Sequence, residues 1–217
     1  MQPVRPFSPT LEAPPTDPAN ARILEAASRH LFAYGYSALT MDDLAHELGM
    51  SKKTLYRYFP GKDAIIGTII DEIGGTLRHE LETVLSQPKL LFSQKLRGVI
   101  DAVIPRLALT NPAMLRELQR YAPEIYQKLD ELRQKNIPSV FGRLFRAGIS
   151  EGSLHADLNP DFAAQFWLQA IRGLVHPDTL ALTHLSPNQT LEKALELFTR
   201  GILTPAGRKE YEKQFPQ

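Results

Sequence analysis

The sequence predicts an all-α fold of about nine helices, in which a long helix joins a small N-terminal three-helix domain to a larger C-terminal helical domain. Apolar residues recur every three or four positions over long stretches, and no stretch alternates apolar and polar residues as a strand does. Ser, Thr, Asp or Asn repeatedly precedes such a stretch, often followed by proline, as at a helix start. We expect domains at 18–64 and 65–204, a flexible proline-rich arm over 1–17 and a polar tail over 205–217.

Composition excludes several classes of protein. The chain has 217 residues, a formal net charge of +1 and no cysteine, so disulfide frameworks, thiolate metal sites and cysteine nucleophiles are excluded. With a charge so close to zero, binding to nucleic acid would need a local basic patch. No apolar run is long enough to span a membrane, and the N-terminus lacks the apolar centre of a signal peptide. We therefore expect a cytoplasmic protein.

Two short helices joined by a tight turn are predicted in the middle of the N-terminal domain. Thr40 is placed to cap the first helix, with an acidic residue three positions later that completes a capping-box-like pair. Gly49 supplies the residue that can adopt a positive φ at the end of that helix. Ser51 caps the second helix, which Pro60-Gly61 ends. This pattern is typical of a helix-turn-helix.

The second of these helices presents basic, hydroxyl and aromatic side chains to solvent. Only Leu55 and Phe59 are expected to point inward. Residues 51–62 hold four basic residues and no acidic one, whereas the preceding helix holds three acidic residues. Positive charge is therefore concentrated on one element, as a helix that faces DNA phosphates requires. A plain structural helical hairpin with a glycine turn is the alternative interpretation.

These helices resemble the DNA-binding domain of the TetR family of transcriptional regulators. The resemblance lies in two adjoining segments, T-M-D-D-L-A-H-E-L-G-M over 40–50 and S-K-K-T-L-Y-R-Y-F-P-G-K over 51–62. It extends upstream through A-R-I-L-E-A-A-S-R-H-L-F-A-Y-G-Y-S-A-L-T, residues 21–40, which is similar to the first helix of that domain and its aromatic-glycine-aromatic exit. In all it covers about 20–66, and the remainder is too variable in this family for a motif match.

The resemblance implies a DNA-binding regulator, usually a repressor, that binds a palindromic double-stranded operator as a dimer and is released by a small-molecule effector. Two recognition helices would enter successive major grooves about 34 Å apart. The resemblance implies that base edges are contacted by Lys52, Lys53 and Thr54, and that phosphates are contacted by Thr40, Tyr56, Tyr58 and Lys62. It allows either role for Arg57 and places Ser51 at the start of the DNA-binding helix. The position of Tyr58 is often histidine in the family, and that of Lys53 is variable, so we expect Lys53 to tune sequence preference.

Two further helices flank the motif. Asp17-Pro18 predicts the start of the first helix, which should end near Gly35. Lys62 opens a long connecting helix that should extend to about residue 87. Gly74-Gly75 lies in the middle of that helix and favours either close helix packing or a flexing point.

The C-terminal domain should consist of apolar helices interrupted by proline. Pro105 and Pro138 fall inside such helices, and kinks of this kind prevent close packing over the full length, so we expect a cavity for an unknown small-molecule effector. The candidate effector-binding residues are Phe92, Val103, Met114, Tyr121, Phe141, Phe145, Phe166, Trp167 and Arg172. For each apolar one, an ordinary core position is the alternative. Arg172 near an apolar cavity requires either an acidic partner or an anionic ligand.

Two amphipathic helices, over about 160–175 and 187–202, are the last that we expect. In the family that the sequence resembles, the last two helices form a four-helix interface with the same helices of a second subunit. A homodimer through these helices is therefore implied by the resemblance. Ordinary core packing would produce the same pattern.

No motif of an enzyme, a cofactor site or a metal site appears, so we expect neither catalysis nor a cofactor. His155 with Asp157, or His176 with Asp178 and His184, would hold a metal only if folded together, and solvated loop histidines are the alternative. Two other functions stay open. One is a DNA-binding protein without an effector, and the other is a protein that binds or sequesters a small molecule and does not read DNA.

Overall fold

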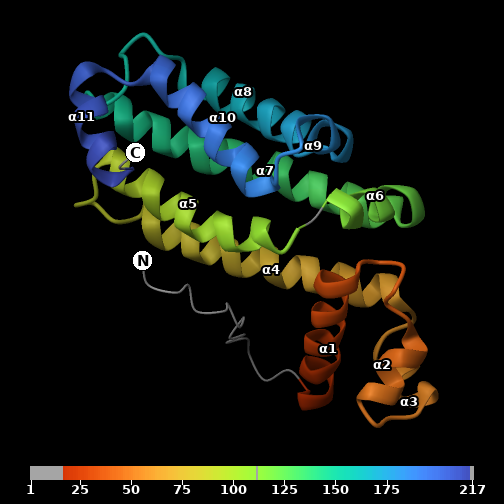
Figure 1. The fold of residues 1–217 in the computed structure, drawn as a ribbon. Coiled ribbons are helices and arrows are strands. Elements are labelled where there is room, and N and C mark those ends of the chain that lie inside the picture. The colour runs from red at the N-terminus through yellow and green to blue at the C-terminus, as the bar shows by residue number, and fades with distance from the viewer. Residues whose placement is uncertain (1–16, 111, 216–217) are drawn as a thin grey trace. The chain divides into compact units, whose positions relative to one another are not determined.

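The computed structural model of the chain describes residues 17–110 and 112–215, which form eleven α-helices (Figure 1). The first four are α1 (Pro18–Tyr34), α2 (Met41–Glu47), α3 (Lys52–Tyr58) and α4 (Lys62–Leu85). The other seven are α5 (Phe92–Ala108), α6 (Pro112–Tyr121), α7 (Pro123–Ser150), α8 (Pro160–Leu174), α9 (Pro177–Thr183), α10 (Pro187–Ile202) and α11 (Pro205–Gln214). The predicted all-α class is confirmed.

The described chain separates into two compact units, one that ends at Ile69 (unit 1) and one that begins at Ile70 (unit 2). Helix α4 runs across this boundary, which lies later in the helix than the one expected between 64 and 65. The arm expected over 1–17 lies, apart from Asp17, outside the described residues.

Unit 1 is held together by the apolar sides of short helices. The Asp17 side chain accepts a hydrogen bond from the Ala19 amide at 3.0 Å and caps α1, which ends at Gly35 with φ 90°. The buried stripe predicted for α1 is present, because Ile23, Leu24, Ala27 and Leu31 are all buried. Burial of these side chains supplies most of the stabilisation of such a small unit.

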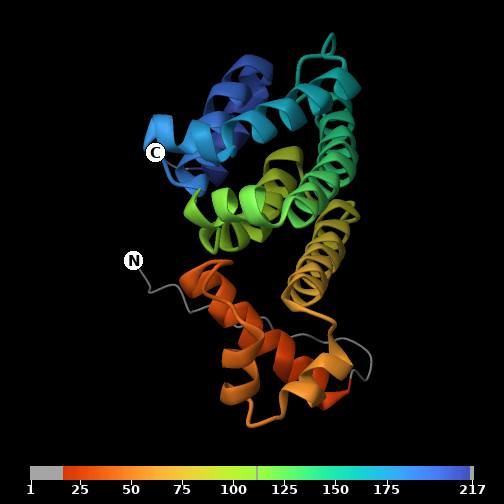
Figure 2. The same cartoon turned by 90° about the vertical axis from the view of Figure 1, so that its right-hand side faces the viewer.

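Unit 2 has one hydrophobic core, to which helices α4 to α10 all contribute buried side chains. Figure 2 shows the ribbons of these helices in a second view. Helix α7 packs against α5, α6 and α8, and Trp167, Phe92 and Phe145 are among the largest fully buried side chains. Both α5 and α7 continue as helices through Pro105 and Pro138. No helix of the described chain is long and apolar enough to cross a membrane.

Two helices are absent from the sequence prediction of about nine. Helix α9 begins after His176, which caps it, and α11 begins after Thr204, whose hydroxyl accepts from the Gly207 amide at 3.0 Å. The polar tail expected from residue 205 is therefore a helix. It packs against α5, because Tyr211 and Phe215, four residues apart on one face, lie against the core of unit 2.

The linker before α11 is fixed to the loop between α7 and α8. The Thr204 amide donates to the Ser153 carbonyl at 3.1 Å, and Leu203 forms an isolated antiparallel bridge with Leu154. A Cβ atom added to Gly207 would lie 2.0 Å from the Ser153 carbonyl oxygen. Only glycine therefore fits at this position without moving backbone.

The two adjacent glycines of α4 differ in their surroundings. A Cβ at Gly74 would lie 3.3 Å from Cδ1 of Leu132 in α7, whereas a Cβ at Gly75 would meet nothing within 4 Å. Close packing thus accounts for Gly74. It does not account for Gly75.

Candidate functional site

Local backbone chemistry sets the angle between α2 and α3. The Thr40 hydroxyl accepts from the Asp43 amide at 3.1 Å and caps α2. Gly49 has φ 63°, and hydrogen bonds from its own amide and from the Met50 amide close the end of α2 in a Schellman turn. Ser51 then caps α3 by accepting from the Thr54 amide at 3.1 Å. The predicted helix-turn-helix is present.

Three side chains of α3 are free on its outer surface. Leu55 is fully buried and Phe59 nearly so, which fixes the inner face of α3 as predicted. Lys53, Tyr56 and Arg57 are exposed and make no hydrogen bond or ion pair with any described residue. They form a basic, aromatic surface, which we call the α3 outer face. Free guanidinium, ammonium and phenol groups are the donors that DNA phosphates and base edges accept.

Two other candidates on α3 are held by acidic residues of unit 1. The Lys52 ammonium donates to Oδ2 of Asp42 at 2.6 Å, and this hydrogen bond raises the pKa of Lys52. The Tyr58 hydroxyl donates to Oδ2 of Asp17 at 2.9 Å, which raises the pKa of Tyr58. Both side chains must exchange a carboxylate for a phosphate or base if they contact DNA.

The Lys62 side chain makes more contacts within the protein than Lys52 or Tyr58 does. Its half-buried ammonium donates to the carbonyls of Tyr36 at 3.0 Å and Leu39 at 3.2 Å and lies 3.9 Å from the centroid of the Tyr36 ring. Burial, and then the hydrogen bond to Asp63, raise the pKa of Tyr36 to about 12. Two of the three N–H donors of Lys62 thus hold the loop before α2 against the start of α4.

An ionic cluster of Arg29, His30 and Glu47 joins α1 to the end of α2. Glu47 accepts from Arg29 at 2.6 Å and from His30 at 2.7 Å. These hydrogen bonds, the one from Arg29 first, lower the pKa of the Glu47 carboxyl. The cluster fixes the helix on which α3 is supported.

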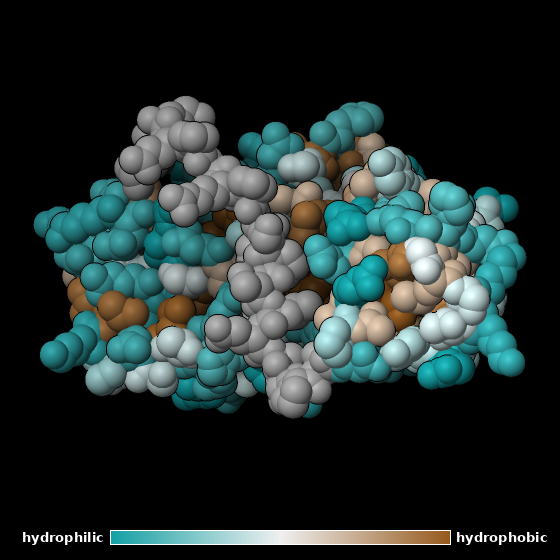
Figure 3. All heavy atoms as spheres, turned by 90° about the horizontal axis from the view of Figure 1, so that it is seen from below, coloured by the Kyte–Doolittle hydropathy of each residue, from teal (hydrophilic) through white to brown (hydrophobic). Residues whose placement is uncertain are grey.

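Much of the surface of unit 1 is hydrophilic. In Figure 3 the right-hand part of the view shows unit 1, with hydrophilic side chains surrounding a smaller apolar area. Residues 51–62 carry four basic residues and no acidic one, and side chains of α3 bind the carboxylates of Asp42 and Asp17 on neighbouring segments. The chemistry that this surface supports is recognition of an anionic polymer.

Most of the predicted effector-binding residues lie inside unit 2. Phe92, Met114, Phe141, Phe145 and Trp167 are buried and Val103 is half-buried. The rings of three of them are in contact, with centroids 5.6 Å apart for Phe141 and Phe145 and 5.3 Å apart for Phe141 and Trp167. These aromatic residues fill space with one another, as core residues do.

The remaining candidates point elsewhere or are paired. Tyr121 is 55% exposed and Phe166 is 53% exposed. Nε and Nη2 of Arg172 donate to the two carboxylate oxygens of Asp130 at 2.8 and 2.7 Å. Of the two requirements that the sequence left open for Arg172, the acidic partner is the one present.

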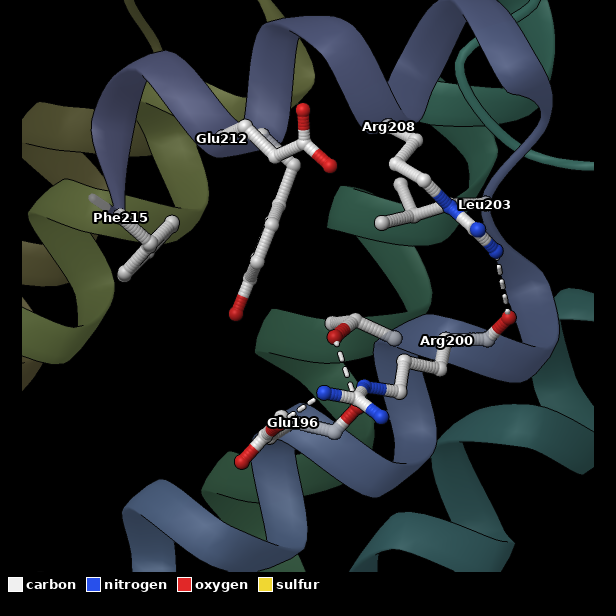
Figure 4. A pocket seen from close by; sticks show the side chains of 8 residues that line it. Glu196, Arg200, Leu203, Arg208, Glu212 and Phe215 are labelled. Carbon is white, nitrogen blue, oxygen red and sulfur yellow. Dashed lines mark hydrogen bonds and ion pairs between the residues drawn. The ribbon is translucent and has the colours of Figure 1, made fainter. Parts of the chain in front are cut away.

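A pocket between α10 and α11 is lined by none of the predicted residues (Figure 4). It has a volume of about 240 Å³ and is bounded by Glu196, Thr199, Arg200, Leu203, Arg208, Tyr211, Glu212 and Phe215. Arg200 is paired with Glu196, and Arg208 reaches only the Arg200 carbonyl, at 3.5 Å. Sequence patterns do not predict this pocket, because α11, which closes it, has the polar composition of a tail.

The proposed histidine sites do not assemble. Among residues 17–110 and 112–215, no group of three or more His, Asp or Glu side chains is placed to hold a metal ion. His176 instead caps α9 by accepting from the Asp178 amide at 3.3 Å, and His184 ends α9 with φ 54°.

Comparison with known proteins places this geometry in a family. Residues 23–69 match the family model of bacterial regulatory proteins of the tetR family. The chain is 23% identical over 181 residues to the uncharacterized HTH-type transcriptional regulator YvaF of Bacillus subtilis, covering 83% of this chain and 94% of YvaF. It is 38% identical over 60 residues to the HTH-type transcriptional regulator EthR of Mycolicibacterium smegmatis, 28% of each chain.

Solved structures of transcriptional regulators share this fold. A transcriptional regulator from Cytophaga hutchinsonii superposes with a TM-score of 0.66 at 20% identity, covering 87% of this chain and all of the other. At that identity the likeness supports the fold alone, whereas the match over 23–69 falls on α1 to α3 and the start of α4. Together with the capped helix-turn-helix and its basic outer face, these matches support a transcriptional regulator of the TetR family, with the family match itself covering residues 23–69.

Proposed function

We propose that the protein is a repressor that binds a palindromic operator as a homodimer and is released by a small-molecule effector in unit 2. The observation that carries this proposal is the α3 outer face, where Lys53, Tyr56 and Arg57 are exposed and unpaired within the described residues. An α-helix with its side chains is about 10–12 Å in diameter, and the major groove is about 12 Å wide, so α3 can lie in the groove. Repression is the commoner mode in this family.

Lys53 and Arg57 are separated by one helical turn and therefore lie on the same side of α3. Lys53 is in the first turn, which in a recognition helix approaches the base edges, and Arg57 is in the last turn. We therefore assign base contacts to Lys53 and Thr54, and phosphate contacts to Tyr56 and Thr40. Arg57 serves either purpose.

An exposed apolar surface supports the dimer. Phe162 and Phe166 on α8 and Leu197 on α10 are 71%, 53% and 76% exposed. The helices expected to form the interface are these two, α8 and α10, although α11 follows them in the chain. Large apolar side chains grouped on two neighbouring helices are typical of a protein interface. A twofold pair would present two copies of α3 to successive major grooves.

The continuity of α4 supports release by an effector. This helix begins at Lys62 in unit 1 and ends at Leu85 in the core of unit 2. An effector that binds more tightly to one position of α4 than to another shifts the spacing of the two α3 helices in a dimer. An effector without that preference leaves DNA binding unchanged.

The proposal is tested by fluorescence anisotropy of labelled DNA from upstream of the gene, at several salt concentrations. Specific binding should weaken steeply with salt, and Lys53→Ala should lower the preference for that DNA over random duplex by about tenfold. Lys89→Ala, which removes an exposed lysine from the loop after α4, is the matched control and should change nothing.

Two outcomes favour the rival functions. If no duplex is bound above the non-specific level, the chain is a small-molecule binding or sequestering protein. If binding is specific but no cell extract or compound library releases it, the chain is an effector-independent DNA-binding protein.

A further inference from the structure

Arg133 places a charge on an apolar side of α7. Leu129 precedes it by four residues and Ile137 follows it by four, and both pack against the hydrophobic core of unit 2. Residues four apart lie on one face of a helix, so the Arg133 side chain leaves α7 among apolar neighbours. It is half-buried. A covered charge at such a position needs a partner.

The carboxylate that acts most strongly on Arg133, that of Asp130, is already bound by two other side chains. Asp130 accepts from Nε and Nη2 of Arg172 at 2.8 and 2.7 Å, and from Nε2 of Gln134 at 2.8 Å. Burial alone would raise the pKa of Asp130, but the hydrogen bonds from Gln134 and Arg172 lower it. Two guanidinium groups thus share one carboxylate, and Arg172 occupies both of its oxygens.

Arg133 itself has no hydrogen bond or ion pair with any residue in the described part of the chain. Burial lowers the pKa of its guanidinium most; Tyr126 and Asp130 act against this, and the charge of Arg172 acts with it. Arginine nevertheless stays protonated in proteins. The Arg133 guanidinium therefore has no directly bound carboxylate, although the charges of Asp130 and Asp178 act on the same cluster.

Tyr126 adds a second donor beside Arg133. It precedes Arg133 by seven residues, two helical turns along the same face, and packs against the core of unit 2. Burial raises the pKa of its hydroxyl, which therefore stays protonated at neutral pH. This hydroxyl too has no hydrogen-bond partner among the described residues.

We propose that Arg133 and Tyr126 form an anion subsite in unit 2, and that its ligand is an organic anion with an apolar body. The guanidinium fork matches two oxygens of a carboxylate, sulfonate or phosphate, and the phenol supplies a third hydrogen bond. Leu129 and Ile137 on the same face are only partly buried by the core, so apolar surface remains beside Arg133 for the rest of the ligand. The subsite names the chemical class of the proposed effector, and in that respect rests on the proposed function.

The test uses the full chain without DNA and two fluorescent probes that share one ring skeleton. 8-Anilino-1-naphthalenesulfonate carries a sulfonate, and N-phenyl-1-naphthylamine lacks it. Arg133→Gln should weaken binding of the sulfonate by about tenfold or more, as loss of a charge-assisted contact does, and leave the neutral probe unchanged. Lys135→Gln removes an exposed charge from the same helix and should alter neither affinity.

Further variants keep the test decisive if Arg133→Gln folds poorly. Tyr126→Phe removes one hydroxyl and should weaken the sulfonate by several-fold, with no effect on the neutral probe. Arg133→Lys retains the charge without the fork, and its affinity should fall between those of the wild type and Arg133→Gln. Without ligand, Arg133→Gln should melt at the wild-type temperature or above, because it removes an unpaired charge.

The proposal is overturned if folded Arg133→Gln binds both probes as the wild type does, if both affinities fall together, or if Lys135→Gln has the same effect. A melting temperature several degrees below wild type would also overturn it, since Arg133 would then have a partner in the protein. Displacement of the sulfonate probe by decanoate or decyl phosphate, with 1-decanol as the neutral reference, distinguishes carboxylate from phosphate ligands. Because no DNA is present, the subsite stands or falls separately from operator release.

Discussion

The ammonium nitrogen of Lys62 lies 3.9 Å from the centroid of the Tyr36 ring and donates hydrogen bonds to the Tyr36 and Leu39 carbonyls. A lysine that the family resemblance places toward DNA phosphate is thus bound to the protein by two of its three donors. Its main contribution to DNA binding is therefore to hold the loop before α2 in place. Only its third N–H donor remains to contact a DNA phosphate.

Lys62→Gln should therefore lower the free energy of unfolding by about 1.5–3 kcal/mol, the usual contribution of hydrogen bonds to a charged group. Urea denaturation followed by circular dichroism measures it. Lys53→Gln, on the exposed α3 outer face, should stay within about 0.5 kcal/mol of the wild type. Equal stability for the two variants would show that the carbonyl contacts of Lys62 are unimportant.

Asp42→Asn should strengthen binding to any duplex DNA by about two- to fivefold, because it releases Lys52 and removes a negative charge that faces phosphate. The gain should shrink as salt is raised. Anisotropy titrations with random-sequence DNA measure it. Asp101→Asn breaks an exposed ion pair on α5 and serves as the reference, and a similar gain there would attribute the effect to net charge alone.

Acid should weaken unit 1 partly through Glu47. Since the folded-state pKa of Glu47 is lowered from its usual 4.5, this carboxylate stabilises the fold above pH 4.5, and the stabilisation is lost as pH falls through the lower folded value. Glu47→Gln should therefore show a shallower loss of stability between about pH 6 and about pH 3. Denaturation at each pH provides the measurement, with exposed Glu124→Gln as the control. A profile parallel to the wild type would exclude the cluster as a source of stability.

Two glycine substitutions should act in opposite directions. A Cβ at Gly148 would lie 2.8 Å from Cγ of Leu154 and 2.8 Å from Cδ2 of Phe92, so Gly148→Ala should cost about 1–3 kcal/mol through overpacking. Gly75→Ala meets open space in α4 and should add about 0.5–1 kcal/mol. Thermal melts of both variants and of the wild type measure the two changes in stability. If Gly75 is the flexing point of α4, the stabilised variant should also lose its response to effector.

Leu197→Glu should separate the proposed dimer into chains of 24.4 kDa. The side chain is 76% exposed on α10, and a charge there is incompatible with an apolar interface. Light scattering after size-exclusion chromatography reports the mass. Leu182→Glu on α9, where the leucine is 80% exposed, is the matched substitution and should leave the dimer intact. A wild type that is monomeric at micromolar concentration would remove the basis of this prediction.

The helix-turn-helix was predictable because its signals are local. Thr40, Gly49 and Ser51 each act on backbone groups within five residues, so their roles follow from sequence position alone. The pairing of Lys52 with Asp42 depends on the relative orientation of two helices, and periodicity does not specify that. Periodicity likewise predicts that Phe141 and Trp167 are buried, but not that they pack against each other.

Helix α11 was missed for a different reason. The composition of α11 is polar, and its two aromatic residues, Tyr211 and Phe215, become partly buried only because α11 packs against α5. The start signal was nevertheless present, because Thr204-Pro205 is the same cap-and-proline pair that opens α8 and α10. The sequence did not point to Arg133, since the pairing of Asp130 with Arg172 is visible only in three dimensions.

The contact between Gly207 and Ser153 makes the end of the chain unusually intolerant of substitution at one point. Elsewhere in α11 a new side chain can turn toward solvent, whereas even a methyl group at 207 would collide with backbone. Gly207→Ala should thus detach α11 from its seat, uncover the faces of Tyr211 and Phe215, and open the pocket beside them. Because Gly207 has no side chain, α11 can pack directly against a loop that lies more than fifty residues earlier in the sequence, whose carbonyls also accept hydrogen bonds from the Thr204 hydroxyl.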